Sequence, residues 1–208
     1  MGIDIELLLS LTVFALVASA TPGPNNLMVM ASGAAFGFRR TLPHVAGIAV
    51  GFSTMIGAAV FGLGALLETF PWALNIVRFA GAAWMFWLAW KLLAPALRPA
   101  EGGDGGTVET TARPFHVHEA ALFQWINPKA WAMAVATAGA FAGIADDTIP
   151  RTIAMCAVFT LVGPPSNFVW VIGGRTIRRL FSPANGGRVF GALMGVLVAL
   201  SAALILFA

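Results

Sequence analysis

Six long apolar stretches leave this chain little room for anything except membrane-spanning helices. They cover residues 5–36, 44–67, 72–94, 120–143, 149–173 and 189–207 of the 208-residue sequence. Most of them reach the roughly 20 residues that a helix needs to cross the hydrocarbon core of a bilayer. Charged residues make up only 10% of the chain, against about 25% in a typical soluble domain. The pattern predicts an all-α integral membrane protein with six transmembrane helices.

The first stretch is interrupted by a helix-breaking hexapeptide, Thr21-Pro22-Gly23-Pro24-Asn25-Asn26. Proline lacks an N–H group and its ring clashes with the preceding turn, so a helix is expected to end here. A break at membrane depth leaves backbone polar groups that only protein or a water-filled cavity can satisfy. The hexapeptide therefore predicts a binding site inside the membrane.

A second break, at Asn127-Pro128, interrupts the fourth stretch. Asparagine is a preferred N-cap and proline a preferred first helical residue, so a half-helix should restart here. We expect Asn25 or Asn26 to cap a second half-helix in the same way. Two such N-termini suit a carboxylate, because free N–H groups and positive dipole ends face it. Lys129 adds a positive charge in the same turn; the alternative is that its side chain snorkels to the interface.

The two breaks divide the chain into similar halves. Residues 95–114 are rich in Gly, Thr and charge, which is typical of a flexible linker between residues 1–94 and 115–208. Twenty positions separate Pro24 from His44, where the second stretch begins, and twenty separate Pro128 from Thr148, where the fifth begins. Each half has three spans, so the second half enters the membrane from the opposite face. The pattern predicts inverted three-helix repeats with broken first and fourth helices, as in secondary transporters.

Basic residues gather in alternate loops. Those after the first, third and fifth stretches hold Arg39, Arg40, Lys91, Arg98, Arg113, Arg175, Arg178, Arg179 and Arg188. The positive-inside rule places these loops in the cytoplasm and both termini outside. The net charge of +3 is then explained by loops that face an anionic leaflet. No nucleic-acid partner is expected.

A third irregularity, Gly163-Pro164-Pro165-Ser166-Asn167, lies in the fifth stretch. Adjacent prolines are expected to kink a helix and free carbonyl groups. Ser166 and Asn167 then either bind polar groups of a substrate or satisfy those carbonyls. Trp125 and Trp131 flank the second break and are candidates to wall the site.

The remaining chemistry-bearing residues give weaker signals. His44 opens the second stretch and is expected at the membrane interface, with proton coupling as the second option. His116, His118 and Glu119 are close together, but their spacing matches no tight zinc pattern. Cys156 is the single cysteine, so it forms no disulfide within the chain. We therefore expect no metal and no cofactor.

The two break motifs, TPGPNNL at residues 21–27 and QWINPKAW at residues 124–131, occur in this order in a chain of this length. Together they closely resemble the LysE/RhtB amino-acid exporter family of bacterial inner membranes, and the resemblance covers essentially the whole chain. It implies export of amino acids of the lysine, threonine, homoserine or leucine type, driven by a proton or other ion gradient. By motif match, the central-site candidates are Pro22, Gly23, Pro24, Asn25, Asn127, Pro128 and Lys129.

The substrate is expected to bind at the breaks and to be transported by alternating access. The full set of expected substrate-binding residues is Thr21, Pro22, Gly23, Pro24, Asn25, Asn26, Gln124, Asn127, Pro128, Lys129, Ser166 and Asn167. No acidic residue is expected at the membrane midplane, so carbonyl oxygens freed at residues 21–23 and 162–164 are the expected acceptors for a substrate ammonium. The other expected partners are membrane lipid and a coupling ion. Small residues spaced four apart permit close helix packing, but they do not establish a homodimer, which stays an open alternative.

Two other classes of function compete with this interpretation. An exporter of a metal cation or another small solute would share the architecture, but a metal site needs Cys, His, Asp or Glu at the breaks. Asn, Pro and Lys stand there instead. An intramembrane enzyme or redox relay would need paired acids, clustered histidines or paired cysteines within the spans. The sequence offers none of these, so we expect no enzyme.

Overall fold

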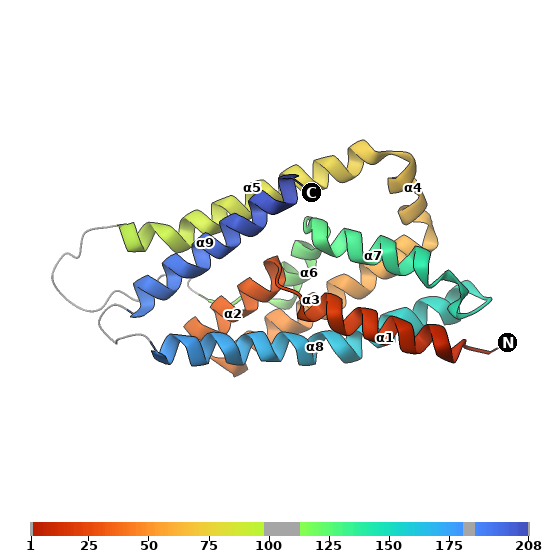
Figure 1. Cartoon of the computed structure of the whole chain (residues 1–208), viewed down its shortest axis with the longest axis horizontal. Helices are drawn as coiled ribbons and strands as arrows, with labels where there is room; N and C mark the ends of the chain where they lie inside the picture. The colour runs from red at the N-terminus through yellow and green to blue at the C-terminus, as the bar shows by residue number, and fades with distance from the viewer. Residues whose placement is uncertain (1, 98–112, 181–185, 208) are drawn as a thin grey trace.

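The computed structural model describes residues 2–97, 113–180 and 186–207, and these are helical without a strand (Figure 1). The all-α prediction is confirmed for this part of the chain. The elements are α1 (Ile5–Ala20), α2 (Pro24–Phe36), α3 (Phe38–Ala58), a π-helical turn η1 (Ala59–Leu63), α4 (Gly64–Thr69), α5 (Pro71–Leu97), α6 (Val117–Trp125), α7 (Pro128–Ala140), a 3₁₀ turn η2 (Ala142–Ile144), α8 (Thr148–Leu180) and α9 (Gly186–Phe207).

Several helices are long and apolar enough to cross a bilayer. Three qualify alone, over Phe38–Leu67, Trp72–Ala94 and Thr148–Arg178, and α1 with α2 qualifies as a fourth, bent by 57° at its break. The apolar part of α9, Val189–Leu204, is shorter than a full span. The chain is thus a multi-pass membrane protein, while the count of six spans stays a prediction.

Both predicted breaks are present. α1 ends at the hexapeptide. Two residues, Ile126 and Asn127, separate the end of α6 from the start of α7. Asn127 caps α7 as expected, since its Oδ1 accepts the backbone N–H of Lys129 at 3.1 Å. The capping prediction for the first half is wrong. Gly23 is the N-cap of α2 and Pro24 its first residue, because the fixed φ of proline suits that position. The two asparagines that follow therefore lie inside the first turn.

Glycines let the central helices approach closely. A Cβ atom at Gly33 of α2 would collide with the backbone of α8, and one at Gly174 of α8 would collide with the backbone of α2. A Cβ at Gly51 of α3 would lie 2.5 Å from the carbonyl oxygen of Ala121 in α6. Small residues at such contacts allow helix backbones to pack tightly in membranes. α2 is thereby fixed on α8, and α3 on α6.

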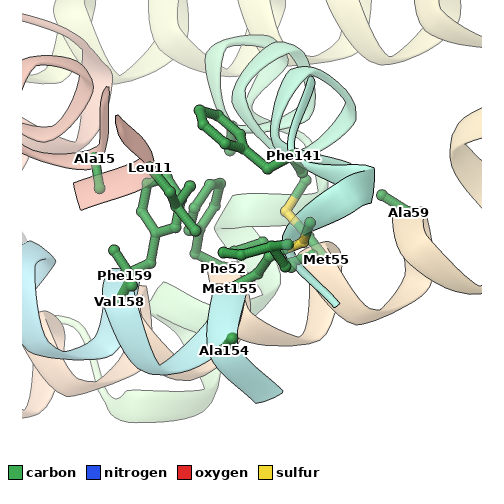
Figure 2. Packing of buried hydrophobic residues seen from close by; sticks show 14 of the residues in the cluster. Leu11, Ala15, Phe52, Met55, Ala59, Phe141, Ala154, Met155, Val158 and Phe159 are labelled. Carbon is green, nitrogen blue, oxygen red and sulfur yellow. The ribbon is translucent and has the colours of Figure 1, made fainter. Parts of the chain in front are cut away.

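The largest apolar core lies between α1, α3, α7 and α8. Figure 2 shows Leu11 of α1 pointing toward the rings of Phe52 and Phe159, with Phe141 close by. The Phe52 and Phe159 rings pack edge to face with centroids 4.8 Å apart. This core holds the first half of the broken helix against α3 and α8.

Large apolar side chains also cover the outside of the molecule. Those exposed on α1 and α8 include Leu9, Val13, Val17, Ile149, Ile153, Leu161 and Val169. Soluble proteins rarely expose contiguous apolar surface on this scale. Lipid contact explains the pattern.

α8 runs as one helix through Pro164 and Pro165. The missing N–H groups leave the carbonyls of Thr160 and Leu161 without a helical donor, but the helix continues. At the end of the first half, α5 continues to Leu97, past the expected start of the linker at residue 95. The rest of that linker, residues 98–112, lies outside the described residues.

Charge separates along the long axis of the molecule. The α2–α3 junction, the C-terminal ends of α5 and α8 and the start of α9 lie toward one end, and the N-terminus and the α7–α8 connection lie toward the other (Figure 1). The first group of segments carries Arg39, Arg40, Lys91, Arg175 and Arg178, and the second carries Asp4, Asp146 and Asp147 together with Arg151. The molecule therefore has a basic end and an acidic end.

Candidate functional site

Lys129 joins the two breaks. Its Nζ donates to the carbonyl oxygen of Thr21 at 2.7 Å and lies 3.4 Å from that of Pro22. These carbonyls follow the C-terminal end of α1, where helical carbonyls lack donors and the helix dipole is negative. An ammonium from the second half of the chain therefore satisfies backbone freed in the first half.

A second link pairs two side-chain amides. Asn25 donates to Gln124 at 2.7 Å, and Gln124 donates back to Asn25 at 3.1 Å. Gln124 is fully buried, and its Nε2 also donates to the carbonyl of Ala120 at 2.9 Å. Both of its amide hydrogens are thereby used, as buried polar groups require. The pair fixes α2 to α6.

Asn26 closes the first break from within. Its Nδ2 donates to the carbonyl oxygens of Ser19 and Thr21, each at 2.9 Å. The Thr21 carbonyl thus accepts from both Asn26 and Lys129. The hydroxyl of Thr21 donates to the Val17 carbonyl at 2.6 Å. The freed carbonyls at the end of α1 are therefore held by side chains from both halves.

Two tryptophans brace the second break. The indole N–H of Trp131 donates to the carbonyl of Trp125 at 2.9 Å, and the two rings pack edge to face at 5.5 Å. The bond satisfies a carbonyl at the C-terminal end of α6. Neither tryptophan lines the cavity described next, and the prediction that they wall a substrate site stays untested.

A cavity of about 60 Å³ lies where the breaks meet. Its polar lining consists of Ser19, Asn25, Asn26, Gln124, Asn127, Lys129 and Asn167. Its apolar lining includes Ile48 and Phe52 of α3, Met133 of α7 and Phe159 of α8. In this conformation the cavity has room for a few water molecules. The arrangement offers five amides and one ammonium beside an apolar wall.

Comparison with known proteins decides the family. Residues 16–208 match the LysE type translocator family. This chain is a LysE type translocator. Relatives include the cysteine/O-acetylserine efflux proteins of Escherichia coli (strain K12), Shigella flexneri and Shigella sonnei. Each is 26% identical over 187 residues, which is 90% of this chain and 89% of the relative. No solved structure matches it.

The translocator family consists of transporters, so this protein is not an enzyme. Most of the residues expected at the site are brought together in the translocator: Gly23, Pro24, Asn25, Asn26, Gln124, Asn127, Lys129 and Asn167 line the cavity. Thr21 and Pro22 are outside the lining, but their carbonyls face Lys129, which lines the cavity. Pro128 and Ser166 are outside the lining.

The apolar wall of the translocator's cavity was not expected from the sequence. Ile48, Phe52, Met133 and Phe159 stand in continuous apolar stretches, where a residue that faces a cavity looks like one that faces lipid. Only the tertiary structure separates the two. The roles of all these residues in binding remain predictions.

His44 of the translocator is buried, with 2% of its surface exposed, and its ring stacks on Phe115 at 5.1 Å. α3 begins earlier than the apolar stretch, at Phe38. The expectation that His44 lies at the membrane interface stays a prediction, because burial between helices does not fix its depth in the membrane. The first turns of α3 carry Arg39 and Arg40, five and four positions before His44.

Glu119, just before the fourth apolar stretch, is held by Arg113. Two guanidinium bonds of 2.6 and 2.7 Å and the backbone N–H of His116 lower the pKa of this carboxyl to about 2. The rings of His116 and His118 stack beside it at 5.6 Å. Within the described residues, no three His, Cys, Asp or Glu side chains gather as a metal site would require.

Proposed function

We propose that this translocator exports a small zwitterionic amino acid, which binds between the two helix breaks and leaves by alternating access. The observation that carries the proposal is the bond from Lys129 to the Thr21 carbonyl across the breaks. It places a cation, free helix N-termini and freed carbonyls around one cavity. The names of the relatives, cysteine/O-acetylserine efflux proteins, support the same class of substrate.

An amino acid offers both charges that this site complements. Its carboxylate suits Lys129 and the N-termini of α2 and α7. Its ammonium suits the carbonyls of Thr21 and Pro22, which Lys129 occupies in this conformation. Binding would therefore exchange one ammonium for another, as Lys129 turns from the carbonyls to the carboxylate. The cavity must widen in the same step, since it now holds only a few waters.

The lining also bears on which amino acid fits. Among the described residues, the cavity wall contains no carboxylate, so a lysine substrate would bury its side-chain charge without a partner. Phe52, Met133 and Phe159 suit a small uncharged side chain. We therefore favour threonine, homoserine, cysteine or a similar substrate over lysine. The same lining supplies none of the ligands that a transition-metal exporter needs.

Helix packing supports the six-span inverted repeat. In such a repeat α1 and α2 correspond to α6 and α7, α3 to α8, and α5 to α9. Each contact in one half then has a counterpart in the other. α1 packs on α8 as α6 packs on α3, and α2 contacts α9 as α7 contacts α5. α5 packs on its own counterpart, α9. This pattern agrees with a site at the repeat interface.

The separation of charge supports the orientation. We propose that the basic end faces the cytoplasm and both termini face outward across a bacterial inner membrane. Export against a concentration gradient then requires a coupling ion, and the proton is the expected one.

An export assay tests the function. Cells are loaded with amino acids supplied as dipeptides, and extracellular amino acids are measured over time. We expect the wild type to accumulate one or more small uncharged amino acids, and Lys129→Ala and Asn25→Ala to lose this export. Arg175→Ala, which removes an exposed charge away from the cavity, is the matched control. If no amino acid accumulates with the wild type, the proposal is wrong.

A further inference from the structure

His44 is a buried titratable group that the site above does not use. Both of its ring nitrogens lie without a hydrogen-bond partner among the described residues. Buried side-chain nitrogens are nearly always bonded, so each exception calls for a functional or structural reason. Stacking on Phe115 explains how the ring is held, but it leaves the nitrogens unexplained.

A second cavity lies beside this ring. It has a volume of about 50 Å³, is lined by residues of α2, α3, α5, α9 and the segment before α6, and has His44 in its wall. Most of the lining is apolar, with Met28, Phe36 and Leu92 as examples. A space of this size admits water. A movement that exposes the buried ring nitrogens to this water would let the imidazole exchange a proton.

α3 connects this cavity to the central one. His44 lies one helical turn before Ile48, which lines the central cavity, and residues four apart share a face of a helix. Between and beyond them, Gly47 and Gly51 pack α3 against the backbone of α6. α6 carries Gln124, the partner of Asn25. Packed residues thus join His44 to a wall of the central site without a gap in the contacts.

Few other groups in the spans can carry a proton. The nine acidic residues lie near the ends of the apolar stretches or in the linker. Lys129 is bonded to the first break, and the thiol of Cys156 donates to the Ser53 carbonyl at 3.4 Å. Histidine changes charge near neutral pH and is a common member of proton relays in transporters.

Two charged groups face His44 from neighbouring elements. Lys91 of α5 lines the same cavity, and Glu119 at the start of α6 is close enough to interact electrostatically. Glu119 is bonded to Arg113, which keeps its pKa at about 2, so it stays ionised between pH 5 and 8. Among the described lining residues, α2 and α9 contribute no titratable side chain.

We propose that His44 is the proton-binding residue that couples export to the proton gradient; this rests on the proposed function. The neutral imidazole fits the conformation seen here, in which its nitrogens are buried. In this largely apolar pocket the charge of an imidazolium is offset only in part, by Glu119, so protonation favours a conformation that admits water. In this cycle His44 binds a proton while the protein is open to the outside, after the amino acid has left. The proton is released to the cytoplasm when the protein opens inward, so one proton enters in exchange for the exported amino acid.

Reconstituted vesicles test the coupling. The purified protein is placed in vesicles that are acidic inside, and labelled L-threonine or L-cysteine is added outside. In the wild type the gradient should drive accumulation above the external level. His44→Gln should accumulate no more than vesicles without a gradient, yet retain counterflow exchange of labelled for unlabelled amino acid. His118→Gln, an exposed histidine, should keep both activities.

The outcomes separate the two proposals. Gradient-driven accumulation by His44→Gln, or loss of its counterflow while its unfolding temperature is unchanged, overturns the coupling role. If the wild type shows counterflow exchange but a pH gradient drives no accumulation, the coupling role is also overturned. The proposed function then still stands. Absence of wild-type exchange with every amino acid tested rejects the proposed function itself.

A second measurement leaves His44 intact, in case its substitution prevents folding. His116 and His118 are the other histidines of the chain, so replacing both with Gln leaves His44 as the source of the imidazole NMR signals. We expect this signal to titrate, and its midpoint to shift when L-threonine or L-cysteine saturates the site. An identical titration with and without the amino acid overturns the proposal.

Discussion

Gly23 leaves the space that the Lys129 side chain occupies. A Cβ atom at this position would lie 2.8 Å from Lys129 Cδ and 3.0 Å from its Nζ. We predict that Gly23→Ala folds, because the lysine side chain is flexible, but displaces the ammonium from the Thr21 carbonyl. A hydrogen bond to a charged group contributes about 1.5–3 kcal/mol, so the export rate should fall by roughly tenfold or more.

Export from dipeptide-loaded cells measures this effect. Gly139→Ala is the control, since a Cβ there meets nothing within 4 Å. If Gly23→Ala exports at the wild-type rate, the hydrogen bond from Lys129 to the Thr21 carbonyl is not needed for export.

The amide pair of Asn25 and Gln124 allows a double-mutant cycle. Replacing either residue with Ala leaves the other amide unsatisfied in a largely buried place, which costs about 1–3 kcal/mol. The double variant should lose less than the sum of the single losses, because it removes both polar groups. Denaturant unfolding in detergent measures the three free energies. Additive losses would show that the two amides act independently.

Residue-level prediction from the sequence succeeded where local chemistry decides the outcome. The cap at Asn127 follows from the Asn-Pro pair alone. The first break is different, because two prolines compete to start α2, and Pro24 begins it before either asparagine can cap. The bonds of Lys129 and Gln124 join residues about 100 positions apart, and no local pattern shows them.

Among the elements, the contact between α2 and α8 depends on Gly174. A Cβ there would collide with the carbonyl of Met30, whereas a Cβ at the adjacent Gly173 meets nothing within 4 Å. We predict that Gly174→Ala destabilises the protein by about 1–3 kcal/mol, as overpacking does. Gly173→Ala should be nearly neutral. Thermal unfolding in detergent compares the two, and equal unfolding temperatures would contradict the close packing of these helices.

The sequence predicted where helices are interrupted better than where a helix changes direction. Proline and glycine mark both helix interruptions, since they act on the backbone directly. The double proline leaves α8 in one piece. By contrast, Gly62 adopts a φ of 114° inside η1 and redirects the chain into α4, in a stretch where the sequence predicted a single span. A lone glycine in an apolar helix gives no sign of such a turn.

For the whole molecule, orientation is the most accessible test. In a Cys156→Ala background, Asp147→Cys at the acidic end should react with a membrane-impermeant thiol reagent added to intact cells. Arg40→Cys at the basic end should react only after the membrane is opened. Both positions are exposed in the structure. Labelling of Arg40→Cys in intact cells would reverse the proposed orientation.

Composition alone predicts the class of the whole molecule, because so apolar a chain cannot fold in water with its surface polar. The inverted repeat needs more than composition. Residue identity between the halves is weak, and the evidence for the repeat lies in which helices pack together. The position of His44 illustrates the same point, since only the packed helices show that it is buried.

Binding of an amino acid by the purified protein tests the site most directly. Labelled L-threonine and L-cysteine are titrated into the wild type, Lys129→Ala and Arg175→Ala, with the matching amine that lacks a carboxylate as competitor. We predict that the wild type and Arg175→Ala bind alike, that Lys129→Ala loses roughly tenfold or more in affinity, as loss of a charge-assisted bond implies, and that the amine competes poorly. Equal binding by Lys129→Ala and the wild type would contradict a substrate site at the paired breaks.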